Sequence, residues 1–159
     1  MPNILVAHGF GTNAEIAKTK QTNNLRDSLL KEGLELVYIQ APIKLSREDF
    51  PFPPVHDITK NDLFSWWTFD GKTAPSLYED VIKSHAGEDV VGIIGLSQGA
   101  SLSGIISANY QRLVPSLKFG IGYGGFFYSS PQLEPDLKAY DGKIQIPFLT
   151  VVGEKDDIV

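Results

Sequence analysis

The sequence predicts an α/β fold with a doubly wound, mainly parallel sheet. Three observations carry this prediction. Short apolar runs rich in β-branched residues alternate with longer segments of helical periodicity. Glycine-containing turns join a strand to a helix at two places, His8–Gly11 and Gly95–Gly99. A proline-rich segment, residues 41–61, interrupts this alternation after a strand, which is where α/β proteins carry covering loops.

The elements follow in a regular order. Ile4–Ala7 is expected to be the first strand, and the polar stretch Asn13–Glu32 a helical region with one apolar face. Further strands are expected at Leu36–Ile39, Val90–Ile94, Phe119–Ile121 and Phe148–Val152, and further helices at Ser76–His85 and Gln98–Leu113. Segment 41–61 holds four prolines, which exclude a helix or an inner strand. We interpret it as a loop that covers the site, a role also open to Tyr123–Gly142.

Composition limits the classes of function. A chain of 159 residues with 42% hydrophobic residues suits a single domain, 1–159, with a substantial core. A formal net charge of -5 without a long basic run argues against a nucleic-acid or anionic-membrane partner. The chain has no cysteine, and its N-terminal apolar run is too short for a signal peptide or a membrane span. We expect a cytoplasmic location, with the nucleus as a second one; the oligomeric state is left open.

The most informative motif is the pentapeptide Gly95-Leu96-Ser97-Gln98-Gly99, which follows a β-branched strand and opens a helix. This arrangement is typical of a nucleophile elbow, in which the serine takes a strained backbone conformation between small neighbours. The turn would lift the hydroxyl of Ser97 above the helix N-terminus, whose free N–H groups can hold an oxyanion. The motif also matches ordinary glycine-rich turns, but the strand before it and the helix after it favour a serine hydrolase.

The first glycine loop permits two interpretations. Gly9-x-Gly11-x-x-Ala14 spells the dinucleotide-binding fingerprint, but that site needs an acidic residue at the end of the second strand, where this chain has Gln40. In a hydrolase, the same loop would supply the backbone N–H of Phe10 as one half of an oxyanion hole. The backbone N–H of Gln98 would be the other half. We therefore favour the hydrolase and keep the dinucleotide-binding domain as an alternative.

The acid of a catalytic triad is expected after the last strand. Asp156 and Asp157 stand there, and the chain order of serine before acid is that of the α/β-hydrolases. The alternative is that the two aspartates form a plain turn. The sequence does not by itself distinguish between Asp156 and Asp157 as the acid.

A base must also lie within hydrogen-bond reach of the serine. The histidines of the chain, His8, His56 and His85, all precede Ser97. We interpret His8 as a residue that orients the first loop by hydrogen bonding, although it is one candidate for a substitute base. His56, in the proline-rich loop, is the other candidate. His85 ends a predicted helix on its solvated side and is not expected to act.

Aromatic residues are concentrated in two segments. They either line an acyl pocket or pack loops onto the sheet. The first set is Phe64, Trp66, Trp67 and Phe69, and the second is Phe126, Phe127 and Tyr128.

Taken together, these motifs resemble the small eukaryotic "family of serine hydrolases" often found in fungi. The resemblance rests on His8-Gly9-Phe10-Gly11-Thr12-Asn13, Tyr38-Ile39-Gln40-Ala41-Pro42, Trp66-Trp67, Gly92 to Ala100, Gly122-Tyr123 and Gly153-x-x-Asp156-x-x-Val159. It implies an α/β-hydrolase fold, Ser97 as nucleophile, Asp156 rather than Asp157 as acid, and esterase activity on carboxylic esters with acyl chains of short to medium length. It implies no cofactor and no metal.

The resemblance also carries a departure. Family members continue past the acid loop into a further strand and a segment with the catalytic histidine, and these 159 residues contain neither. We therefore expect a domain that is truncated at its C-terminus. The alternative function is a catalytically silent remnant that binds acyl or ester ligands without turnover.

Overall fold

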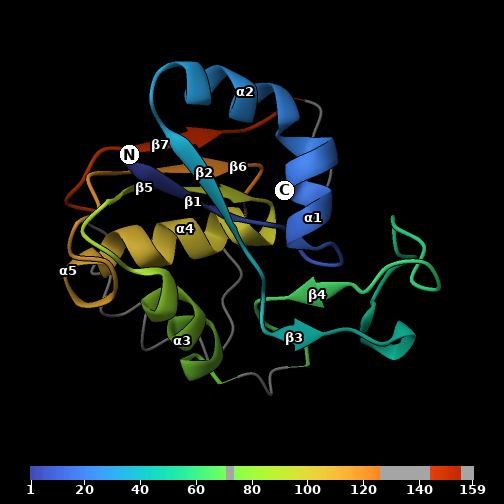
Figure 1. The fold of residues 1–159 in the computed structure, drawn as a ribbon. Coiled ribbons are helices and arrows are strands. Elements are labelled where there is room, and N and C mark those ends of the chain that lie inside the picture. Colours follow the sequence, from blue (N-terminus) through green and yellow to red (C-terminus); the bar gives the residue numbers. More distant parts are fainter. Residues whose placement is uncertain (71–73, 126–143, 155–159) are drawn as a thin grey trace.

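The computed structural model of this chain describes residues 1–70, 74–125 and 144–154. Its centre is a five-stranded sheet in the order β2-β1-β5-β6-β7, and every neighbouring pair is parallel (Figure 1). The strands are β1 (Asn3–Ala7), β2 (Glu35–Ile39), β5 (Val90–Leu96), β6 (Phe119–Tyr123) and β7 (Phe148–Val151). The helices are α1 (Ala14–Ile16), α2 (Asn23–Lys31), α3 (Ser76–His85), α4 (Gln98–Ala108) and α5 (Tyr110–Leu113).

Helices cover both faces of this sheet, and β1 shows why. Its side chains alternate between two cores, as expected of a strand that is buried on both sides. Leu5 and Ala7 belong to the larger core, which includes residues of α3 and α4. Ile4 and Val6 belong to a smaller core, against which Leu29 of α2 packs. Figure 1 shows α3 and α4 on one side of the strands and α2 on the other, so the predicted doubly wound α/β fold is confirmed.

Two predicted helices are each divided in the structure. The region Asn13–Glu32 forms α1, a π-helical turn (Ala17–Gln21) and α2. The division falls at Thr22, which has φ -130° and whose hydroxyl bonds to the carbonyl of Ala17 at 2.8 Å and the hydroxyl of Tyr38 at 2.6 Å. The region Gln98–Leu113 divides into α4 and α5 at Asn109. No helix within the described ranges combines the length and hydrophobicity that a membrane crossing requires.

The proline-rich segment lies outside the central sheet. It contains β3 (Ile43–Lys44), which pairs with β4 (Phe64–Ser65) in a separate antiparallel ladder, and a 3-10 turn, Arg47–Asp49. A capping box between Ser46 and Asp49 fixes the start of that turn. As predicted, the segment supplies neither an α-helix nor an inner strand.

The strand order by itself indicates where a ligand site is expected. From β1 the chain moves outward to β2 through α1 and α2, whereas from β5 it moves the other way to β6 through α4. The neighbouring strands β1 and β5 end level with each other, with Ala7 opposite Gly95. Ligands of doubly wound sheets bind at the carboxyl ends of strands where connections diverge in this way. Both glycine turns singled out in the sequence lie at this point.

Candidate active site

Ser97 occupies the turn between β5 and α4 and has a strained backbone. Its angles are φ 52° and ψ -116°, and among the described residues no other non-glycine residue has a positive φ. Such a conformation costs an L residue about 1–3 kcal/mol and persists only where its surroundings enforce it. The N–H of Ser97 donates to the carbonyl of Tyr123 at 2.9 Å, while its side chain is exposed to solvent.

The glycines that flank Ser97 are required by close backbone contacts. A Cβ on Gly95 would lie 1.9 Å from the carbonyl oxygen of Gly99, so the end of β5 and the first turn of α4 touch. A Cβ on Gly99 would lie 2.1 Å from the carbonyl oxygen of Ala7, so α4 also touches the end of β1. Strand and helix can therefore close around Ser97 only if both positions lack a side chain.

The first glycine loop lies directly against Ser97. A Cβ on Gly9 would lie 3.2 Å from Ser97 Cβ and 3.8 Å from Ser97 Oγ. Two residues on, Gly11 has φ +68°, and a Cβ there would lie 2.7 Å from the ring of Phe50. A Cβ at position 9 would require its neighbours to shift by a few tenths of an ångström, whereas position 11 needs glycine for its positive φ.

His8 is fully buried at the base of this loop, and its contacts fix its tautomer. The amide nitrogens of Ala41 and of the Gln40 side chain each lie 3.1 Å from His8 Nε2, and both can only donate. Nε2 is therefore the acceptor, and Nδ1 carries the proton that it donates to the carbonyl of Gly9 at 2.8 Å. Burial lowers the pKa of His8 to about 4 and outweighs the hydrogen bond to Gly9, which raises it. His8 is consequently neutral near pH 7, with both ring nitrogens occupied.

This hydrogen bond also orients a backbone donor. The peptide between Gly9 and Phe10 is planar and trans, so its C=O and N–H point in opposite directions. Because His8 holds the C=O, it also sets the direction of the Phe10 N–H. These contacts belong to a histidine that orients the loop.

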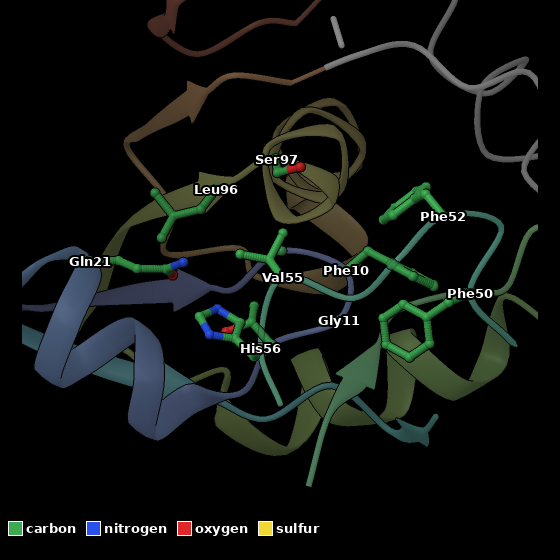
Figure 2. Close-up of a pocket in the computed structure, with 11 residues that line it drawn as sticks. Phe10, Gly11, Gln21, Phe50, Phe52, Val55, His56, Leu96 and Ser97 are labelled. Carbon is green, nitrogen blue, oxygen red and sulfur yellow. The ribbon is translucent and has the colours of Figure 1, made fainter. Parts of the chain in front are cut away.

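Ser97 lines a cavity of about 160 Å³ to which the proline-rich segment contributes residues. Phe50, Phe52, Val55 and His56 of that segment line it together with the first loop and Ser97. Figure 2 shows the rings of Phe10, Phe50 and Phe52 gathered on one side and His56 with Gln21 on the other. The ring centroid of Phe10 lies 5.3 Å from that of Phe50 and 5.9 Å from that of Phe52. The cavity is therefore mainly apolar, with one histidine.

The tryptophans of the first aromatic set are core residues. Trp66 and Trp67 are 0% and 2% exposed and belong to the larger core, where Trp67 packs edge-on against Tyr78. Phe64 packs against the same core, and Phe69 contacts the ring of Phe10 at 5.0 Å. None of these four residues lines the cavity at Ser97. Of the two interpretations of this set, packing holds for the two tryptophans and for Phe64.

The side chain of Gln98 has a structural role that the sequence did not predict. It is fully buried, accepts a hydrogen bond from the N–H of Trp66 and donates one to the carbonyl of Trp67, both at 2.9 Å. We had expected only its backbone to matter. One signal was available: Gln98 is the single long polar side chain in α4, whose other residues are small or aliphatic.

The first loop is poorly arranged for a dinucleotide. The amide of Ala14, at the start of α1, donates to the side chain of Gln40 at 3.1 Å, and the amide of Ile16 donates to that of Asn13 at 2.8 Å. A pyrophosphate would need such amides to be free. Nor does the described part of the chain contain a cluster of three or more His, Cys, Asp or Glu side chains able to hold a metal.

The remaining candidates lie away from Ser97 or outside the described residues. His85 is exposed at the end of α3, where its ring bonds to the carbonyl of Val81 at 2.8 Å. Asp156 and Asp157 lie outside the described residues, as does the second aromatic set, Phe126, Phe127 and Tyr128.

The parallel sheet has helices on both faces, and the turn that holds Ser97 lies at its switch point. This architecture is that of an α/β-hydrolase fold. A family model described as serine hydrolase (FSH1) matches residues 1–159, and the chain belongs to that family. It is 28% identical over 181 residues to "Family of serine hydrolases 3" of Saccharomyces cerevisiae, covering 98% of this chain and 66% of that protein. It is 32% identical over 173 residues to an esterase of Aedes aegypti, covering 98% of this chain and 60% of that one. The chain thus spans less than two thirds of the length of these curated relatives.

A solved structure supports the fold. The crystal structure described as a dienelactone hydrolase from Klebsiella pneumoniae superposes with a TM-score of 0.54 at 15% identity. The match covers 98% of this chain and 74% of that chain. At this level of identity the likeness shows the α/β-hydrolase fold and nothing finer.

Proposed function

We propose that this chain carries the nucleophile and the oxyanion hole of a serine esterase. One observation carries the proposal: in a serine hydrolase family member, the strained residue at the switch point is Ser97, exposed toward a cavity and pressed against the Gly9 loop. Strain of this kind concentrates at functional sites. Ser97 Oγ attacks the ester carbonyl, and the turn acts as a nucleophile elbow.

The oxyanion is held by two backbone N–H groups, those of Phe10 and Gln98. Gln98 opens α4, so its amide belongs to the free N–H groups of a helix N-terminus and benefits from the helix dipole. Phe10 N–H is oriented through His8, as described above. Loss of one such donor in an enzyme of this kind lowers kcat by about 10²–10³-fold.

The proton of Ser97 needs an acceptor, and the family resemblance assigns Asp156 as the acid that would support a histidine. His56 shares the cavity with Ser97 and is the substitute base to test first, because both ring nitrogens of His8 are engaged. Without a base, an oxyanion hole and substrate binding still give about 10³–10⁴-fold catalysis over water.

The substrate is a small carboxylic ester. Attack forms a bond between Ser97 Oγ and the carbonyl carbon, and the alkoxide leaves with the proton that the serine gave up. Water then cleaves the acyl-enzyme and restores the hydroxyl. The aromatic lining of the cavity suits the apolar part of such an ester. No cofactor enters this scheme.

A fluorophosphonate probe with intact-mass readout tests the proposal. Ser97 Oγ bonds to phosphorus, fluoride leaves and the hydroxyl proton is lost, so an activated serine gains the mass of one probe less that of HF. We expect a single adduct on the folded chain and none on Ser97→Ala, and we expect His56→Ala to show whether His56 is the base. An adduct that survives Ser97→Ala would refute the assignment of the nucleophile. A folded chain that gives no adduct would favour the alternative, a silent remnant that binds esters without turnover.

A further inference from the structure

The two proposed oxyanion donors come from separate parts of the chain, the loop after β1 and the start of α4. A single peptide segment, residues 64–67, lies between these two parts of the chain and is hydrogen-bonded to both parts. We call it the bridging segment.

On one side the bridging segment pairs with the first loop. The N–H of Gly11 donates to the carbonyl of Phe64 at 3.0 Å, and the N–H of Phe64 donates to the carbonyl of Thr12 at 2.8 Å. Trp66 adds a third bond, because its indole Nε1 donates to the carbonyl of His8 at 2.8 Å. The loop 8–12 is thus bonded to the bridging segment at both of its ends.

On the other side the bridging segment is held by a single side chain. Gln98 Oε1 accepts from the N–H of Trp66 and Gln98 Nε2 donates to the carbonyl of Trp67, both at 2.9 Å. The side-chain amide of Gln98 therefore uses its acceptor and one of its donors on the backbones of two consecutive residues. Gln98 and Trp66 are both 0% exposed, so water cannot replace these bonds.

We infer that Gln98 and Trp66 are positioning residues. Their side chains set the distance between the backbone N–H groups of Phe10 and Gln98. The chain of bonds runs from Gln98 through the backbone of Trp66 and its indole to His8, and from His8 to the peptide that carries the Phe10 N–H. This inference rests on the proposed function. It assigns to the Gln98 side chain a role separate from that of its backbone.

The geometry of an oxyanion hole is sensitive to small displacements. A misplacement of about 1 Å by a change that does not touch the reacting atoms can lower a rate about 10²-fold. Gln98→Met keeps the length and the apolar stem of the side chain but removes both hydrogen bonds. Trp66→Phe keeps an aromatic ring in the core but removes the bond to His8. Either change should loosen the same connection.

The control is Ser103→Ala, in the same helix. Ser103 is also fully buried, and its hydroxyl bonds to the carbonyls of Ala100 at 2.7 Å and Ile121 at 3.1 Å. It has no bond to the bridging segment among those described. Ser103→Ala therefore reproduces a loss of buried hydrogen bonds in α4 without the proposed effect.

The first test measures fluorophosphonate labelling at several probe concentrations, which separates the maximal rate from the half-saturating concentration. We expect Gln98→Met and Trp66→Phe each to lower the maximal rate by roughly 10–100-fold with little change in the half-saturating concentration. We expect the double variant to lose less than the product of the single losses, because both act through one connection. Ser103→Ala should keep the wild-type rate. Labelling of Gln98→Met at the wild-type rate would overturn the inference and leave the proposed function intact.

The second test does not depend on reactivity. Amide ¹H–¹⁵N spectra of the folded chain should show the resonance of Phe10 shifted, and its hydrogen exchange accelerated, in Gln98→Met but not in Ser103→Ala. A Phe10 amide that is unaffected by Gln98→Met would overturn the inference even if the wild-type chain proves unreactive. A shifted Phe10 amide in an unreactive wild-type chain would support the connection and refute the proposed function alone.

Discussion

Acid should destabilise this protein through His8, and the size of the effect follows from its burial. Burial lowers the pKa of His8 from its ordinary 6.5 to about 4. As the pH falls through this range, the unfolded chain binds a proton that the folded chain does not. The contribution of His8 to stability is therefore fully present above about pH 6.5 and is lost progressively toward pH 4. The unfolding free energy lost over the full titration of His8 is about 3 kcal/mol, and the part lost between about pH 8 and pH 5 is about 2 kcal/mol.

Urea unfolding at a series of pH values measures this effect. Far-UV circular dichroism reports the fold, and the joint fluorescence of Trp66 and Trp67 reports the core beside the site; the ring centroid of Trp66 lies 5.5 Å from that of His8. Carboxylates also titrate in acid, so the useful quantity is the difference in unfolding free energy between the wild type and His8→Gln. His8→Gln cannot titrate, and it should be the less stable protein near pH 8, because it loses hydrogen bonds of a buried ring.

The difference between the two proteins should narrow by about 2 kcal/mol from about pH 8 to pH 5. A wild-type to His8→Gln difference that does not change with pH would refute the lowered pKa assigned to His8.

Two further predictions concern the turn at Ser97. Gly99→Ala should prevent native folding, because its Cβ would lie 2.1 Å from a backbone oxygen. Gly104→Ala, in the same helix, would meet its nearest atom at 3.9 Å and should raise the unfolding free energy by up to about 1 kcal/mol in urea titrations; a soluble, native-like Gly99→Ala would contradict the contact. Ser97→Gly should be more stable than Ser97→Ala by roughly 1 kcal/mol, because both lack the hydroxyl and only alanine keeps a Cβ at positive φ. Equal melting temperatures for those two variants would show that the turn is not strained.

The parts of the fold that depend on local pattern could be predicted. Gly95 and Gly99 are separated by the spacing that a close strand-to-helix turn requires, so the sequence indicated the turn at Ser97 without any knowledge of the neighbours. Apolar β-branched runs likewise located the five strands of the central sheet, whereas the two-residue strands β3 and β4 were not predicted, because two residues show no periodicity. Their bounds differed by one or two residues: β1 and β2 begin one residue earlier than predicted, β5 and β6 end two residues later, and β7 ends one residue earlier.

The parts that depend on distant contacts could not be predicted. The helical region after β1 divides at Thr22 because its hydroxyl meets Tyr38, a contact 16 residues apart in the chain. The side chain of Gln98 meets the bridging segment 32 residues before it. No periodicity records either contact, and at position 98 the motif drew attention to the backbone alone. The polar contacts that organise the site therefore join residues far apart in the chain and cannot be predicted from local sequence patterns.

The strain at Ser97 shows why the pentapeptide is not sufficient by itself. A residue with φ 52° relaxes unless several neighbours prevent it. Here Gly99 packs on the end of β1, Gly95 packs on Gly99, and the Ser97 N–H is held by the carbonyl of Tyr123 at the end of β6. The constraints come from the carboxyl ends of β1, β5 and β6, which are neighbours in the sheet although they are far apart in sequence. The strained turn is thus maintained by the carboxyl ends of the inner strands of the parallel sheet. The same five residues outside such a sheet would lack the contacts that hold the serine in place.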